Sequence, residues 1–213
     1  MKIFQPILPA ALTQPDNLVG FLEAEDSISE VHIKDMILSS SDLEKKSIDG
    51  SLFETTDFSE VSTTRLDISD SVLKDCNFTV AEFPESSWLR VAVKSSRCTG
   101  LNISRSLLRN VGFTNSKLEF VNFRFSKLEN VAFENCVLTD VDFYDAQLKD
   151  VEFINCIINS ITFAQARMKN VDISESTVEG IKGTSSLKGV TISHDQLLQL
   201  APYFAAEAGI KVK

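Results

Sequence analysis

Two histidines and four cysteines are the residues of this 213-residue sequence whose chemistry could serve catalysis or metal binding. His32 and His194 lie near opposite ends of the chain, and the cysteines form no C-x-x-C pair of the kind that binds zinc. The sequence also lacks the glycine motifs of phosphate-binding loops and the G-x-S-x-G motif of serine hydrolases. We therefore predict a protein that is not an enzyme and that has no metal site and no cofactor.

A five-residue period organises most of the sequence. Of the 31 positions reached in steps of five from Ile28 to Val178, 30 hold hydrophobic residues, and Thr63 is the exception. A helix repeats every 3.6 residues and a strand every 2, so neither keeps a spacing of five on one face. The chain must therefore turn a corner after every five residues.

A second regular position precedes each apolar centre by two residues, and it holds small or branched residues such as Ser126, Val131 and Ala146. Residues two apart in an extended segment share a side, so both positions can point inward. Three of the four cysteines occupy this second position, and we interpret them as reduced thiols that pack like small hydrophobic residues.

The motif small-[Asp/Asn]-[Leu/Phe]-x-x recurs as SDLEK, TDFSE, CNFTV, VNFRF and VDFYD. It resembles the repeat of the pentapeptide-repeat proteins, and the resemblance covers residues 28–183. It implies an all-β fold, a right-handed four-sided β-helix, here of about 7 to 8 coils at the usual strand spacing. A weaker resemblance to the quinolone-resistance group of this family implies binding to type II topoisomerase by mimicry of DNA.

Four-sided winding places alternate pentapeptides on opposite sides of the coil. Phenylalanine centres then face one another across one axis and leucine centres across the other, which fills the interior without voids. Asn115, Asn135 and Asn155 would form a ladder at one corner, because asparagine tolerates the left-handed backbone of a tight turn. The predicted structural core comprises Phe113, Leu118, Phe123, Leu128, Phe133, Leu138, Phe143, Leu148, Phe153 and Phe163.

The stretch EFPESSWLRVAVKSSRCTG, residues 82–100, fits the repeat least well. Pro84, Trp88 and Cys98 are unusual at their positions. We expect a local bulge or kink there.

The ends of a solenoid expose its core unless they are capped. Residues 1–27 are predicted to form an N-terminal capping segment, with a short helix within PDNLVGFLEAED, and residues 184–213 a helical C-terminal cap. Ser193 and Gln196 form a capping-box pattern, Pro202 should kink or divide the helix, and Gly209 should end it. The resemblance implies that the C-terminal segment also forms a homodimer, and the candidate cap and dimer residues are Leu197, Leu200, Tyr203, Phe204 and Ile210.

The net charge is −9, and it is unevenly distributed. Residues 1–85 hold 17 acidic and 6 basic residues, whereas residues 86–112 hold five basic residues and no acidic one. An acidic chain repels nucleic acid, so we expect a protein partner, although acidity also simply maintains solubility. The candidate acidic interaction surface consists of Asp42, Glu44, Asp49, Glu54, Asp57, Glu60, Asp67 and Asp70.

The five basic residues form the candidate nucleic-acid site. Four-sided winding spreads them over every side of the rod, as a collar, and no aromatic residues interleave them as in single-strand binders. We interpret them as charge compensation beside the acidic end. The basic collar consists of Arg90, Lys94, Arg97, Arg105 and Arg109.

These patterns predict a non-enzymatic scaffold for protein interactions that presents a rigid, largely acidic rod. The alternative is a DNA-mimicking modulator of DNA gyrase or topoisomerase IV that protects against quinolones, and the remote alternative is a nucleic-acid binder acting through the basic collar. The start MKIFQPILPA is not a signal-peptide pattern, and no apolar run is long enough to cross a membrane. We expect a soluble cytoplasmic protein.

Overall fold

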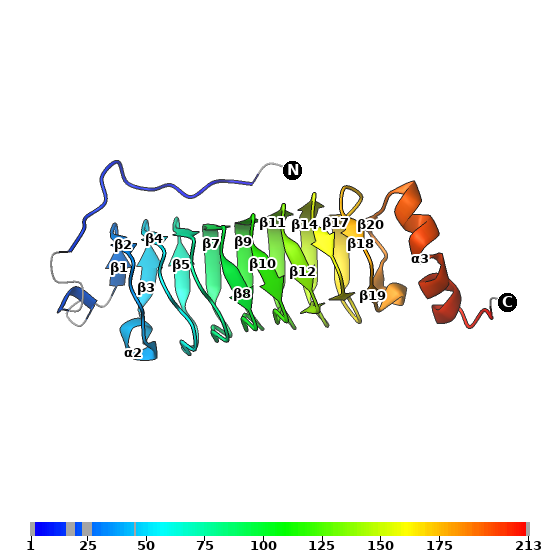
Figure 1. The fold of residues 1–213 in the computed structure, drawn as a ribbon, viewed down its shortest axis with the longest axis horizontal. Coiled ribbons are helices and arrows are strands. Elements are labelled where there is room, and N and C mark those ends of the chain that lie inside the picture. The colour runs from blue at the N-terminus through cyan, green and yellow to red at the C-terminus, as the bar shows by residue number, and fades with distance from the viewer. Residues whose placement is uncertain (1–2, 16–19, 23–26, 45, 212–213) are drawn as a thin grey trace.

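The computed structural model describes residues 3–15, 20–22, 27–44 and 46–211. In this part the chain winds into a parallel β-solenoid of about eight turns, drawn out as a rod in Figure 1. Strand partners are 20 residues apart, as in the pairing of Phe113 with Phe133 and of Phe133 with Phe153, except in the last pair, where Val171 pairs with Val190. Five residues per side and four sides per turn account for this spacing, which confirms the winding expected from the period.

We name the four sides by the inward residues that they stack in steps of 20. Side A runs from Ile28 to Met168, side B from Ile33 to Ile173, side C from Leu38 to Val178 and side D from Leu43 to Phe163. Sides A and C therefore face each other across the core, as do sides B and D.

Sides A and B form one sheet, which has 12 strands in the described residues. Side A carries β1 (Ser27–Ser29), β3 (Ser47–Asp49) and β5 (Asp67–Ser69), and side B carries β2 (His32–Lys34), β4 (Leu52–Glu54), β6 (Val72–Lys74) and β20 (Val190–Thr191). The remaining strands turn the corner from side A to side B, and they are β7 (Ser87–Lys94), β9 (Leu107–Thr114), β11 (Lys127–Glu134), β14 (Gln147–Ile154) and β17 (Arg167–Asp172).

Sides C and D hold shorter strands. Side C carries β8 (Arg97–Thr99), β10 (Lys117–Glu119), β12 (Val137–Thr139), β15 (Ile157–Ile158) and β18 (Thr177–Val178). Side D carries β13 (Val141–Asp142), β16 (Ile161–Thr162) and β19 (Ile181–Lys182), preceded by single bridges such as Asn102 with Asn122. The four-residue helix α2 (Ser40–Leu43) replaces a strand at the start of side D.

Left-handed residues make the corners. The predicted asparagine ladder is one of them, since Asn115, Asn135 and Asn155 have φ of 51°, 53° and 50°. Most other corners also hold polar residues or glycine, which tolerate this backbone better than bulky apolar residues do. The corner is thus the reason for the polar fifth residue of the repeat.

Aromatic stacks fill the core. The Phe133 ring lies 5.1 Å from Phe113 and 4.8 Å from Phe153 on side B, in nearly parallel planes. Across the core, it meets Phe123 and Phe143 of side D edge to face. Edge-to-face and offset-stacked rings are the favoured geometries, so one column satisfies both at once. All ten residues predicted for the core are buried.

Serine ladders explain the small inward position on side A. The Ser86 N–H donates to Ser106 Oγ at 2.9 Å, and the Ser106 N–H donates to Ser126 Oγ at 3.1 Å. Each hydroxyl oxygen therefore binds the backbone of the preceding coil while remaining buried.

The expected bulge in residues 82–100 is wrong, because the 20-residue pairing continues through them. Trp88 is buried on side A, and Cys98 on the facing side of the same turn is small enough to leave it room. Pro84 breaks no bond between coils. At the equivalent positions one and two turns later, the N–H of Ser104 and the N–H of Arg124 donate to a side chain two residues earlier in the same coil. The N–H that proline lacks is therefore not needed for pairing between coils.

The C-terminal cap consists of the 3-10 helix η1 (Thr184–Ser186) and the helix α3 (His194–Glu207). The predicted capping box is present, since the Gln196 N–H donates to Ser193 Oγ at 3.2 Å and the Ser193 N–H to Gln196 Oε1 at 2.8 Å. Pro202 lies inside α3 and does not divide it, and Gly209, with φ of 72°, follows the end of the helix.

The inner face of α3 differs from the prediction. Leu200 is buried and Phe204 is partly buried against the core, but Leu197 is 46% exposed. Gln196 is buried instead, because its Nε2 donates to the carbonyl groups of Ile173 and Ser176 in the last coil. A polar residue thus terminates the open edge of the solenoid.

The N-terminal residues only partly form a cap. Leu22 is buried in the core and Phe21 packs against it. Residues 3–13 do not cover the end of the rod: they run along its length, as Figure 1 shows, and the expectation of a single capping segment is wrong for them. The predicted helix in PDNLVGFLEAED falls largely on residues 16–19 and 23–26, which lie outside the described residues.

Candidate interaction surfaces

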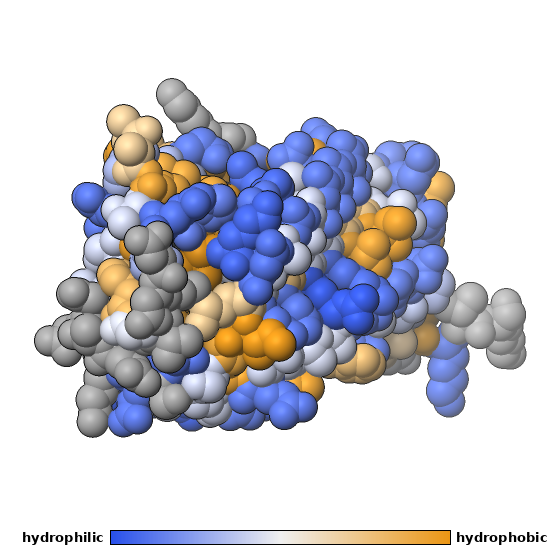
Figure 2. Space-filling model, turned by 60° about the vertical axis from the view of Figure 1, so that its left-hand side comes forward, coloured by the Kyte–Doolittle hydropathy of each residue, from blue (hydrophilic) through white to orange (hydrophobic). Residues whose placement is uncertain are grey.

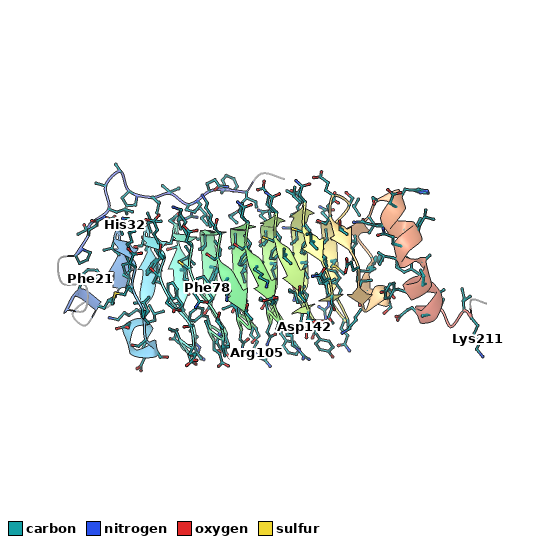
Figure 3. The ribbon with its side chains drawn as sticks, viewed as in Figure 1. Phe21, His32, Phe78, Arg105, Asp142 and Lys211 are labelled. Carbon is teal, nitrogen blue, oxygen red and sulfur yellow. The ribbon has the colours of Figure 1, made fainter. Side chains whose placement is uncertain are left out.

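The histidines and cysteines come together in no catalytic arrangement. His32, labelled in Figure 3, lies on β2 with its Nδ1 3.0 Å from Gln14 Nε2, whereas His194 begins α3 at the other end of the rod. The four cysteines are buried and free, and burial raises the pKa of the Cys98 thiol to about 12. Within the described residues, no group of three His, Cys, Asp or Glu side chains could hold a metal ion.

Opposite charges one coil apart form rungs along the rod. The Glu54 carboxylate accepts from the Lys74 ammonium at 2.6 Å, and this contact lowers the pKa of Glu54. Glu129 likewise bridges Arg109 and Lys149, one coil to either side. The 20-residue register therefore fixes the positions of charges on the surface as well as those of side chains in the core.

The candidate acidic surface does not form a single patch. Asp49 and Asp67 lie on side A, Asp57 and Glu60 on side C, and Asp42 is in α2 on side D. Two other carboxylates of this set, Glu54 and Asp70, are neutralised by ion pairs. Glu54 pairs with the Lys74 ammonium, and Asp70 pairs with the Arg90 guanidinium. Glu44 follows α2 as its C-cap residue.

The basic collar also surrounds the rod. Arg90 and Arg109 lie on side A and pair with Asp70 and Glu129, so their charges are compensated. Lys94 on side B, Arg97 on side C and Arg105 at a side D corner have no ion pair within the described residues. No two of these three share a side, as predicted for a collar. This spacing disfavours continuous contact with a duplex.

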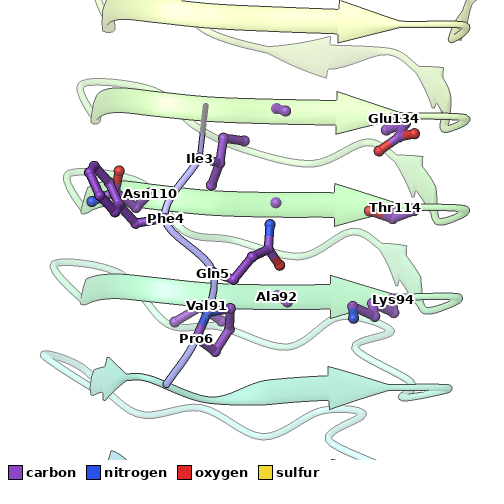
Figure 4. Close-up of a pocket in the computed structure, with 12 residues that line it drawn as sticks. Ile3, Phe4, Gln5, Pro6, Val91, Ala92, Lys94, Asn110, Thr114 and Glu134 are labelled. Atoms are coloured by element: carbon purple, nitrogen blue, oxygen red, sulfur yellow. The ribbon is translucent and has the colours of Figure 1, made fainter. Parts of the chain in front are cut away.

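A strap formed by residues 3–13 lies against side B. The Ile7 N–H donates to Asp70 Oδ1 at 3.0 Å, and Thr13 pairs with Val31 of the first coil. Figure 4 shows residues 3–6 crossing β7, β9 and β11. Ala92, Gly112 and Ala132 form the floor beneath them, around a cavity of about 60 Å³.

The strap explains why small residues occupy outward positions there. Ala92 and Ala132 point away from the core and are nevertheless buried, because the strap covers them. Residues 3–6 of the same chain therefore cover this part of side B. The sequence signal that could have identified this seat is the run Ala, Gly, Ala at intervals of 20.

Residues 126–200 match the family model described as pentapeptide repeat region. The chain therefore contains the repeats of the pentapeptide-repeat family. Pentapeptide-repeat proteins are generally non-enzymatic scaffolds. No curated protein was found as a relative of this chain.

Solved pentapeptide-repeat structures are similar to this chain. HetL, involved in heterocyst differentiation regulation in the cyanobacterium Nostoc sp. strain PCC 7120, is 12% identical, with 83% of this chain and 95% of HetL covered and a TM-score of 0.37. Full-length QnrB1, a plasmid-mediated fluoroquinolone resistance protein, is 16% identical, with 84% and 99% covered and a TM-score of 0.37. At these identities the likeness concerns the fold alone.

The surface of this protein is mainly hydrophilic, with separate hydrophobic spots, as Figure 2 shows for one face. Some spots belong to the cap, where Leu197, Leu198, Tyr203 and Ile210 are exposed. Others lie at corners of the coils, where sequence reasoning did not look for functional residues. The signal for them is an apolar residue at the position that normally holds Asn, Asp or Gly. No helix in the described residues is long and apolar enough to span a membrane.

Proposed function

We propose that this protein is a non-enzymatic scaffold for protein–protein interaction. One observation carries the proposal: the sides of the rod hold outward side chains in fixed rows, because strand register and charge rungs both repeat every 20 residues. A surface that is rigid before binding loses little conformational entropy on association. The predicted compartment is the cytoplasm.

The test is capture of partner proteins from the native host, followed by titration of each captured protein against the purified chain. We expect at least one partner to bind saturably, with equal affinity before and after removal of nucleic acid by nuclease. A chain unfolded by a core substitution serves as the control. The absence of any saturable partner would contradict the scaffold function.

A narrower candidate is modulation of type II topoisomerase by DNA mimicry, which the acidity of the first 85 residues supports. The distribution of those carboxylates over all four sides and the pairing of Glu54 and Asp70 with cations weaken this candidate. It predicts inhibition of gyrase supercoiling, or protection of gyrase from a quinolone, at micromolar protein. The absence of both effects at that concentration would exclude this candidate. A gel shift at low salt tests the remote alternative, nucleic-acid binding through the basic collar.

The exposed apolar residues of α3 and of the segment that follows it support a homodimer through the C-terminal segment. Leu198 and Ile210 are more than half exposed. Sedimentation equilibrium of the intact chain and of Leu198→Glu tests this arrangement, which predicts a dimer that the substitution dissociates.

A further inference from the structure

Three corners of the coils carry bulky apolar residues. Val80 is 55% exposed, Phe120 is 61% exposed and Phe125 is 39% exposed. All three have left-handed backbones, with φ of 58°, 55° and 62°. Bulky and β-branched residues are rare in this conformation, and their neighbours along the same corners are mainly polar residues or glycine.

Exposure limits the contribution of these residues to the stability of the fold. Exposed aromatic side chains gain little hydrophobic stabilisation, and the left-handed backbone is less favourable for them than for asparagine. Residues that break a local rule without a compensating gain in stability are expected at functional sites. The apolar residues at these corners therefore indicate a role in binding and not in folding.

The two phenylalanines flank one side D pentapeptide, and a cation–π network extends from the second. The Arg105 guanidinium lies 4.8 Å from the centre of the Phe125 ring, and the Arg124 guanidinium lies 4.6 Å from that of the Tyr144 ring. Phe125 and Tyr144 meet edge to face at 5.8 Å. The network thus spans three successive coils.

The backbone beneath the network is fixed. The Arg124 N–H donates to Asn122 Oδ1 at 3.0 Å, and the Tyr144 N–H donates to Asp142 Oδ1 at 2.8 Å. The side chains are therefore presented by a rigid support before any partner arrives. Gly100, with φ of 71°, lies between Val80 and Phe120 in one corner column.

The two side D pentapeptides at the centre of this region, residues 101–105 and 121–125, carry one arginine each and no acidic residue, whereas residues 141–145 at its edge carry Asp142 and Asp145. Arg105 has no ion pair within the described residues, and the Arg124 guanidinium is 3.7 Å from Asp142, its one described carboxylate partner. Stacking on a ring occupies one face of a guanidinium and leaves its N–H edge available to a carboxylate. Figure 3 places Arg105 and Asp142 at the edge of the rod opposite the strap, so the strap leaves this region open.

We propose that these residues form a docking surface for an acidic segment of a partner protein, one in which carboxylates alternate with apolar side chains. The proposal rests on the scaffold function and names its surface. Arginine and aromatic residues provide most of the binding energy of many protein interfaces, and the two guanidinium groups complement carboxylates. The docking surface consists of Val80, Arg105, Phe120, Arg124, Phe125 and Tyr144.

Fluorescence anisotropy with four labelled probes tests the proposal on the intact chain. The probes are a twelve-residue peptide of alternating Glu and Leu or Phe, the same peptide with Lys for Glu, the same peptide with Ser for the apolar residues, and an oligothymidine of twelve nucleotides. The Glu and apolar peptide is expected to bind at least about tenfold more tightly than the others.

The double variant Phe120→Asn/Phe125→Asn should weaken that binding at least about tenfold. Because asparagine suits a left-handed corner, its thermal midpoint should equal or exceed that of the unsubstituted chain. Gln165→Asn, at the same corner column as Phe125, is the matched control and should change affinity by less than about twofold. Arg105→Gln/Arg124→Gln should also weaken binding about tenfold, with less dependence on salt.

Equal binding of all four probes, no binding of the Glu and apolar peptide, or binding that the asparagine substitutions leave unchanged would overturn the proposal. Preference for oligothymidine would overturn it in favour of nucleic acid. If the asparagine variant still captures its host partner at full affinity, this surface is refuted while the scaffold function stands. Loss of that partner on the same substitutions supports both.

Discussion

Replacement of Phe133 by alanine probes the stacked core most directly. The Phe133 side chain is fully buried and contacts four rings, two stacked and two edge to face. Removing it leaves a cavity on the order of 100 Å³, which at about 24 cal/mol per Å³ costs about 2.4 kcal/mol. The lost burial adds about 2 kcal/mol, so we expect about 4 kcal/mol of destabilisation.

The measurement is the free energy of unfolding in urea, followed by circular dichroism and by fluorescence of the single tryptophan, Trp88. For a chain of this length, about 4 kcal/mol corresponds to a fall in Tm of about 8 to 16 °C. Lys127→Ala, at an exposed position in the same strand, should change the free energy by less than about 0.5 kcal/mol. A loss below about 1.5 kcal/mol for Phe133→Ala would refute the idea that the ring columns support the solenoid.

Three further predictions concern the surface, the glycines and the cap. Asp70→Asn should lower the free energy of unfolding by about 1 kcal/mol at pH 7, because Arg90 lowers the pKa of Asp70 in the folded state. The difference between the wild type and the variant should shrink as the pH falls below about 4 and the carboxylate is protonated. Urea unfolding at pH 7 and pH 3 measures this. Gly112→Ala should stabilise the fold by about 0.5 to 1 kcal/mol, because the added Cβ meets no atom within 4 Å. Gly183→Ala should destabilise the fold by more than that, because φ is 79° and the added Cβ would lie 2.4 Å from backbone atoms. Thermal denaturation of both variants compares them. Gln196→Leu should cost about 2 kcal/mol and accelerate hydrogen exchange in the last coil alone, because two carbonyl groups lose their donor.

Each has an outcome that contradicts its reasoning. An Asp70→Asn deficit that is equal at pH 3 and pH 7 would show that the ion pair is not the cause. If Gly112→Ala and Gly183→Ala changed Tm alike, the cavity and corner assignments would be wrong. Uniform acceleration of exchange throughout the chain in Gln196→Leu would show that the cap acts on the whole rod.

The repeat could be predicted because one interaction type determines it. Each turn must bury a residue such as Phe133 or Leu138 at the same position, and the penalty for a polar residue there acts independently on every coil. The same logic identified the Asn115 corner. The same logic does not hold at Trp88, where the large side chain predicts a bulge that the structure lacks, because Cys98 on the facing side of the core leaves room for the indole ring.

The surface features could not be predicted in the same way. The strap has no period, so nothing within residues 3–13 shows that residues 3–6 lie beside residues 91–134. The capping-box pattern predicts only the contact of Gln196 with Ser193, whereas the Gln196 side chain also donates to two carbonyl groups of the last coil. The docking surface escaped notice because Phe120 and Phe125 look like further hydrophobic residues until the corner backbone is seen.

The strap also has a consequence for synthesis. Its residues leave the ribosome before those of the coils, and the coils on which residues 3–6 rest are complete only after Glu134. At the usual 5 to 20 residues per second, the strap waits about 6 to 26 seconds for its seat. During that interval the coils already formed expose the outward small residues, first Ala92 and then Gly112, to solvent. Side B of the nascent chain therefore differs from side B of the folded protein.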